Sequence, residues 1–108
     1  MAEPLDEKKH FELLFVELVY SLQNMALIAL GKLANPATQK AERYLPQAQA
    51  TIDMLRMLKV KSQGNLSDIE QKMLERVILD LQLNYADEAH KPEPVAEKSP
   101  EKTKEGGS

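Results

Sequence analysis

The chain has 108 residues, which is enough for one small domain, and 43% of them are apolar. It has no cysteine and only two histidines, which excludes disulfides, thiolate nucleophiles and cysteine-ligated metal sites and leaves a histidine-built metal site unsupported. The formal net charge is −3 and no basic cluster of the kind that binds nucleic acid is present, so we expect no nucleic-acid partner.

Three stretches place apolar residues at helical spacing, and two joints rich in turn-forming residues separate them. No segment shows the alternation, or the enrichment in Val, Ile and Thr, that is typical of strands. We therefore predict an all-α fold, a small three-helix bundle in which one long helix precedes a hairpin of two helices. The predicted organisation is a short N-terminal extension over residues 1–6, a helical domain over 7–85 and a tail over 86–108.

The first helix is predicted to begin near Asp6, which can cap its N-terminus, and to end at Leu30 and Gly31. Glycine suits the left-handed residue that follows many helices. Asn35 and Pro36 then favour a turn, because proline disfavours the helical conformation in the residue before it.

This first helix carries two apolar arcs, where a surface helix usually carries one. One arc consists of Phe11, Phe15, Leu18, Val19, Leu22, Met25 and Ala29, and the other of Leu13, Val16, Tyr20 and Leu27. The other two helices can cover one arc, and an uncovered arc would be a contiguous apolar patch of the kind that marks an interaction surface. We expect self-association through this helix, with a dimer favoured. The candidate interface residues are Phe11, Phe15, Leu18, Leu22, Met25, Tyr20 and Leu27.

Three polar residues, Ser21, Gln23 and Asn24, lie in the middle of this apolar helix. They either line a buried polar seam that sets the register of an oligomer or belong to the one solvated strip of the helix. The sequence leaves both interpretations open.

The second helix is predicted to begin around Leu45 and Pro46, because proline is accepted in the first turn of a helix. It is predicted to run to about Gln63. The third helix is predicted to end near Tyr85.

The joint between the second and third helices has the most specific local pattern in the chain. Gly64 can adopt the left-handed conformation and Leu66 can make the apolar contact that accompanies it. Ser67 and Glu70 have the spacing of a capping box, in which each side chain bonds the backbone of the other residue. These four residues and Asn65 form the predicted structural joint, and its short length makes the two helices neighbours.

Charged residues give no catalytic arrangement. Five basic residues form either a small patch for an acidic partner or an ordinary solvated face: Arg56, Lys59, Lys61, Lys72 and Arg76. Asp53 lies beside the apolar stripe of the second helix and is the carboxylate to inspect for a buried partner. No nucleophile lies beside a base and no pair of metal ligands shares a helical face, so we expect no enzymatic activity, cofactor or metal.

The tail over residues 86–108 contains no aromatic residue and no Leu, Ile or Met. Such a segment buries too little apolar surface to offset the entropy lost on ordering, so we predict a disordered tail. Its mixed charge and spaced prolines suit either a solubility or linker segment or a short recognition motif.

Short motifs are distributed between Phe11 and Tyr85. They are Leu30-Gly31, Asn35-Pro36-Ala37-Thr38, Ile52-Asp53-Met54-Leu55, Lys61-Ser62-Gln63-Gly64-Asn65-Leu66-Ser67 and Leu79-Asp80-Leu81. Together they resemble a small bacterial family known as domain of unknown function 1844. That family usually has Thr where this chain has Ser62, and a small polar residue where it has Tyr44. The resemblance implies a short, helical, bacterial cytosolic protein and implies no activity, cofactor or catalytic residue.

The sequence favours a non-catalytic helical protein-interaction module that self-associates through its first helix, with an unidentified protein partner also possible. The N-terminus lacks the basic start and apolar run of a signal peptide, so we expect a cytoplasmic location. An alternative is a membrane-associated protein that uses residues 13–30, although Glu17, Gln23 and Asn24 argue against a span. A third is an enzyme or ligand-binding subunit whose site forms only between protomers.

Overall fold

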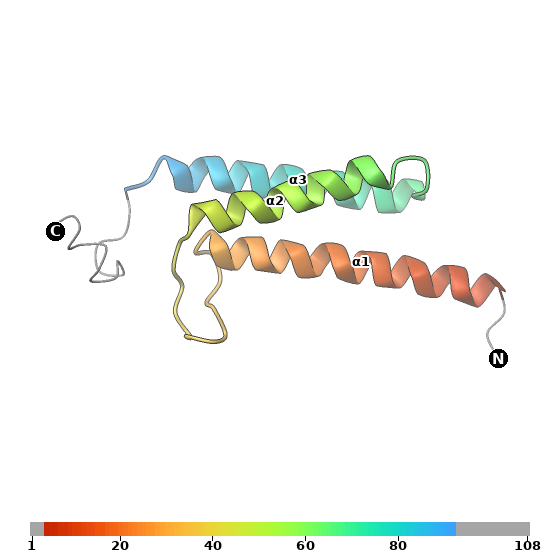
Figure 1. Ribbon diagram of the computed structural model, residues 1–108, viewed down its shortest axis with the longest axis horizontal. Helices are drawn as coiled ribbons and strands as arrows, with labels where there is room; N and C mark the ends of the chain where they lie inside the picture. Colours follow the sequence, from red (N-terminus) through yellow and green to blue (C-terminus); the bar gives the residue numbers. More distant parts are fainter. Residues whose placement is uncertain (1–3, 93–108) are drawn as a thin grey trace.

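Three helices make up residues 4–92, the part of the chain that the computed structural model describes (Figure 1). They are α1 (Pro4–Ala29), α2 (Leu45–Lys61) and α3 (Asp68–Ala89). In Figure 1, α2 and α3 form a hairpin, and α1 lies alongside and runs antiparallel to α2. No strand occurs within residues 4–92, so the prediction of an all-α three-helix bundle is confirmed.

Turn-forming residues interrupt the chain where the sequence predicts. Gly31 follows α1 with φ of 80°, and Gly64 lies between α2 and α3 with φ of 87°, both in the left-handed region. Pro46 lies in the first turn of α2. The capping box at the start of α3 is confirmed: the Ser67 hydroxyl accepts from the Glu70 amide at 3.1 Å, and the Glu70 carboxylate accepts from the Ser67 amide at 2.8 Å.

Two helix limits differ slightly from the prediction. Helix α1 begins at Pro4 and not near Asp6, which is consistent with the acceptance of proline in a first turn. Helix α2 ends at Lys61, two residues before Gln63. Ser62 is its C-cap, with its hydroxyl donating to the Leu58 carbonyl at 2.6 Å, so the last turn closes earlier than the apolar pattern suggests.

The third helix is longer than predicted. It continues to Ala89, four residues beyond Tyr85, so the predicted tail over 86–108 begins too early. The composition of residues 86–89 does not predict this helix end, because the contacts that stabilise it come from the connection between α1 and α2. The remainder of the predicted tail, residues 93–108, and the first three residues of the predicted extension lie outside the described residues.

A single apolar core lies between the three helices. Its buried residues are Val19, Ala26, Ala29 and Leu30 from the α1 end, Ala48, Ile52 and Leu55 from α2, and Leu74, Val77, Ile78 and Leu81 from α3. Thr51 is also buried, and its hydroxyl donates to the Gln47 carbonyl at 2.9 Å, so it contributes no unpaired polar group.

The core contact of α1 runs along the inner edge of its first apolar arc, so α2 and α3 cover that arc only in part. The buried line of α1 consists of Val19, Ala26, Ala29 and Leu30. Glu12 and Gln23, which separate the two arcs, are half-buried beside this line. Each arc keeps its outer edge exposed, with Leu18 on one side of the buried line and Leu13 on the other.

The connection between α1 and α2 folds back on itself. Isolated antiparallel bridges pair Leu30 with Arg43 and Asn35 with Lys40. The predicted turn at Asn35 is present, since the Asn35 side chain accepts from the Ala37 amide at 2.8 Å. A Cβ at Gly31 would lie 3.4 Å from the Arg43 Cβ, an ordinary contact distance, so its φ of 80° and not a lack of space favours glycine there.

Candidate interaction surface

An exposed apolar stripe runs along α1 on the side that borders α2. We define the α1 stripe as Phe11, Leu14, Leu18 and Met25, whose side chains are 44–58% exposed. Their spacing of three, four and seven residues places all four on one face of the helix. Large apolar side chains aligned in this way form a contiguous patch, which is unusual on a small soluble domain.

Two further apolar residues of α1, Leu13 and Tyr20, are exposed on the other side of the buried line. Glu17, Ser21 and Asn24 lie exposed between this pair and the α1 stripe. Ser21 and Asn24 therefore belong to a solvated strip of the isolated chain, whereas Gln23 is half-buried near the core.

A groove of about 670 Å³ opens at the Phe11 end of the stripe, between α1 and the joint that connects α2 to α3. Phe11 and Phe15 supply its apolar wall from α1, and Leu66 supplies it from the joint. Ser62 also lines it, so this end of the stripe lies beside the end of α2.

A second groove, of about 310 Å³, lies at the opposite end of the stripe. Met25 and Ile28 line it from α1, and Tyr44 and Gln47 line it from the start of α2. Because Met25 lies opposite Gln47 here and Phe11 lies near Ser62 at the other end, the two helices run past each other with Leu18 level with the middle of α2.

The middle of α2, which lies level with Leu18 of the stripe, carries two exposed methionines. Met54 and Met57 are 42% and 46% exposed. Met54 lies seven residues after Gln47 and seven before Lys61, so these three residues share the helical face that continues from the Met25 groove. We call the α1 stripe together with Met54 and Met57 the α1–α2 face.

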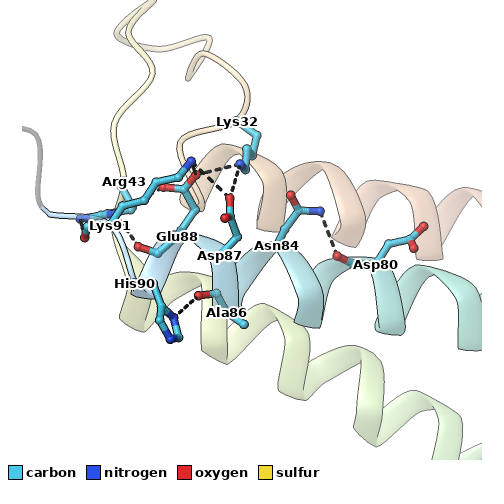
Figure 2. Close-up of polar contacts among 9 residues, drawn as sticks. All are labelled: Lys32, Arg43, Asp80, Asn84, Ala86, Asp87, Glu88, His90 and Lys91. Carbon is cyan, nitrogen blue, oxygen red and sulfur yellow. Dashed lines mark hydrogen bonds and ion pairs between the residues drawn. The ribbon is translucent and has the colours of Figure 1, made fainter.

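A cluster of charged residues at the far end of the bundle is structural. Figure 2 shows the Arg43 side chain reaching the end of α3, where it donates to the Glu88 carbonyl at 2.6 Å and to the Lys91 carbonyl at 3.4 Å. Only 6% of the Arg43 side chain is exposed. The Glu88 carbonyl is one of the last in α3 and also accepts from the Lys91 amide at 3.1 Å, so Arg43 adds a second, charged donor where the helix ends.

The Glu88 carboxylate is surrounded by three cations in the same cluster. It lies 2.8 Å from the Lys32 ammonium, 3.0 Å from that of Lys91 and 3.3 Å from the Arg43 guanidinium. The bond from Lys32 is the main reason that the pKa of Glu88 falls from 4.5 to about 2. The bonds that the Lys91 ammonium donates to Glu88 and Asp87 raise the pKa of Lys91 in turn. This cluster attaches the connection after α1 to the end of α3.

The remaining charged candidates pair with neighbouring side chains on the surface. Arg56 donates to Asp53 at 3.0 Å, so the carboxylate singled out in the sequence is an exposed partner of an arginine on its own helix. Lys59 lies 3.7 Å from Glu75, and Arg76 lies 3.7 Å from Asp80. Lys61 and Lys72 are exposed. Within residues 4–92 no group of three or more metal-ligating side chains comes together.

The seven interface residues predicted from the sequence divide into two groups. Phe11, Leu18, Met25 and Tyr20 are exposed, whereas Phe15, Leu22 and Leu27 are half-buried and pack against the core. The joint residues lie together as predicted, with Leu66 packed against the core and Asn65 donating its amide to the Ser62 carbonyl at 2.9 Å.

Sequence reasoning missed three members of the α1–α2 face. Leu14 carries a readable signal, because it lies three residues after Phe11 and four before Leu18. Met54 and Met57 carry none, because their position beside the α1 stripe depends on how α2 packs on α1. The Arg43 cluster also carries none, since Arg43 and Glu88 are 45 residues apart in the sequence.

A family model described as a domain of unknown function, DUF1844, matches residues 12–87. This range contains all three helices except the first turns of α1 and the last residues of α3. Neither the comparison with curated proteins nor the comparison with solved structures gives a match.

Proposed function

Since the chain belongs to the DUF1844 family, whose model covers most of its helical domain, we propose that it is a non-catalytic, cytoplasmic helical interaction module that self-associates through α1. The single observation that carries this proposal is the α1 stripe, four large apolar side chains that stay 44–58% exposed among the described residues, 4–92. Burying each of them in an interface would contribute roughly 1 kcal/mol, because about half of each side chain is already shielded and full burial is worth about 1.5–3 kcal/mol.

Self-association suits this surface because helix-to-helix packing is the ordinary way to bury a stripe with a spacing of three and four residues. Two-fold dimers are also the most common oligomers, since one self-complementary patch is sufficient to form them. Arg56, Lys59 and Arg76 pair with neighbouring carboxylates at the surface, which is the arrangement of an ordinary solvated face.

The test is light scattering after size-exclusion chromatography of the full chain, over a hundredfold range of concentration. We expect a dimer that dissociates on dilution. A monomer at every concentration would contradict self-association and direct attention to a different partner.

A second candidate function is membrane association, which one observation favours. Residues Asp6–Ala29 are long and apolar enough to cross a bilayer by length and composition, and only 11% of the most apolar window is buried. The core helix of a soluble protein can have the same length and apolar composition, but it is usually mostly buried. Half-buried Glu12 and Gln23, with exposed Glu17, place polar groups around the helix and weigh against a span.

Flotation with liposomes separates these two candidates. The interaction module should remain in the dense fraction with vesicles of neutral or anionic lipid. Recovery of the chain with the floating vesicles would support the membrane candidate.

A further inference from the structure

Resting on the proposed self-association, we propose that two copies of this chain pack antiparallel through the α1–α2 face. The two-fold axis passes between Leu18 of each copy and between Met54 of each copy, so that α1 and α2 of both copies form a four-helix bundle. Helix α3 of each copy lies outside this bundle.

The positions of the exposed residues favour this arrangement. Leu18 lies seven residues from both Phe11 and Met25, so the stripe has equal length on either side of it. An antiparallel copy centred on Leu18 therefore brings Phe11 of one chain level with Met25 of the other. On α2, the same axis brings Gln47 of one chain level with Lys61 of the other, because Met54 lies midway between them.

The two ends of the face have complementary shapes. At one end Phe11, the most exposed residue of the α1 stripe, projects from the helix. At the other end the groove of about 310 Å³, with walls from Met25 and Tyr44, offers an apolar recess. An antiparallel arrangement places each Phe11 beside the groove of the other copy. A parallel arrangement would instead place the two Phe11 side chains together and leave both grooves empty.

Charge also favours the antiparallel orientation. Lys61 lies at the Phe11 end of the face, whereas Glu42 lines the groove at the Met25 end. No ion pair within residues 4–92 involves either side chain. Antiparallel packing brings opposite charges to each end, which sets the orientation of a helical pair.

The area of the face suits a dimer that dissociates at low concentration. Its six apolar side chains are 42–58% exposed. They expose roughly 500 Å² in total, because a large apolar side chain presents about 200 Å² when fully exposed. A standard stable interface buries about 800 Å² on each partner, and the polar rim of this face, which includes Gln47 and Lys61, supplies part of the difference.

Paired cysteines test the orientation, because the chain has no cysteine of its own. We would prepare the full chain with Gln47→Cys, with Lys61→Cys and with both substitutions, and treat each with a short thiol-specific cross-linker. Both positions are exposed. They are 14 residues apart on α2, or about 21 Å at 1.5 Å per residue, so they cannot be joined within one copy.

We expect a covalent dimer from the double variant and none from either single variant. Suppose that scattering shows a dimer. If the double variant then forms no cross-link, or if both single variants form one, the antiparallel arrangement is overturned but self-association is not. A monomer in the scattering measurement would overturn both.

A matched pair of charged substitutions tests the face itself. Leu18→Glu places a carboxylate at the proposed axis and should weaken dimerisation by at least about 100-fold, as expected for the centre of an interface. Leu83→Glu alters a more exposed leucine on α3, outside the face, and should leave dimerisation unchanged. Circular dichroism should show unchanged helicity in both variants. Equal weakening by both substitutions, or none by Leu18→Glu, would overturn the assignment of the face.

Discussion

Gly64 has φ of 87°, and apart from its chain neighbours no heavy atom lies within 4 Å of the position a Cβ would occupy. The backbone conformation alone therefore restricts this position. We predict that Gly64→Val lowers the free energy of unfolding by about 1–2 kcal/mol, because a β-branched residue resists positive φ. Gly64→Asn should cost clearly less, since asparagine tolerates the left-handed region. Urea denaturation measures both, and equal losses would show that strain at φ is not the cause.

Glu88 makes the stability of the fold depend on pH in the acid range. The pKa of its carboxyl is about 2 in the folded chain against an ordinary value of 4.5. Above pH 4.5 the Glu88 carboxyl is ionised in both the folded and the unfolded chain, and its full contribution to the free energy of unfolding is present. As the pH falls from 4.5 towards 2, the unfolded chain takes up the proton first and the stabilisation is lost. The loss is at most about 3 kcal/mol, from 1.36 kcal/mol for each pKa unit.

Other carboxylates titrate in the same range, so Glu88→Gln is the control for this prediction. Glutamine keeps the size and an acceptor oxygen but not the charge that Lys32, Arg43 and Lys91 surround. At neutral pH the native chain should be more stable than the variant to urea, and the difference should shrink as the pH falls below 4.5. A difference that stays constant down to pH 2 would assign the acid sensitivity to other groups.

At the scale of an element, the end of α3 depends on a residue from another part of the chain. Replacing Arg43 with methionine keeps the aliphatic stem but removes the bonds to the Glu88 and Lys91 carbonyls. We expect a loss of about 1–3 kcal/mol in unfolding free energy, the usual range for hydrogen bonds that involve a charged group. Amide hydrogen exchange should accelerate over residues 86–89.

Arg56→Met is the matched control for this change. Arg56 also pairs with a carboxylate, but its side chain and that of Asp53 are both more than half exposed. An exposed pair contributes little, so the variant should lie within about 1 kcal/mol of the native chain. Similar losses in the two variants would mean that the burial of Arg43 has no special role.

These elements also show which parts of the fold the sequence predicts. Gly31, Pro46 and the Ser67–Glu70 box act through the backbone within a few residues, so each could be identified from the sequence. The end of α3 could not, because Arg43 reaches it from 45 residues away. The buried strip of α1 was predicted only in part, since Val19 belongs to the first apolar arc, whereas Ala26 and Leu30 belong to neither arc and are buried only through the packing of α2 and α3.

For the whole molecule, the candidate surface was predictable only in part. The excess of apolar residues on α1 predicts an apolar surface that the chain's own hairpin covers only in part. The sequence could not divide the seven candidate residues into exposed ones such as Leu18 and half-buried ones such as Phe15. It also could not place Met54 level with Leu18, because that alignment depends on the antiparallel packing of α1 and α2, which the two grooves between them record.

Association through α1 should make the thermal stability of the whole molecule depend on its concentration. A hundredfold increase in protein concentration favours the folded dimer by at most about 2.7 kcal/mol, or half of that for each chain, and by less where the dimer dissociates within the range; the upper limit corresponds to a rise of about 5–10 °C in Tm for a domain of this size. Leu18→Glu should abolish this dependence. Because nearly half of the Leu18 side chain is exposed in a single copy, the variant should melt close to the native chain at the lowest concentration. Melting curves followed by circular dichroism provide the measurement, and a native Tm that does not move with concentration would contradict a dimer that forms through this face.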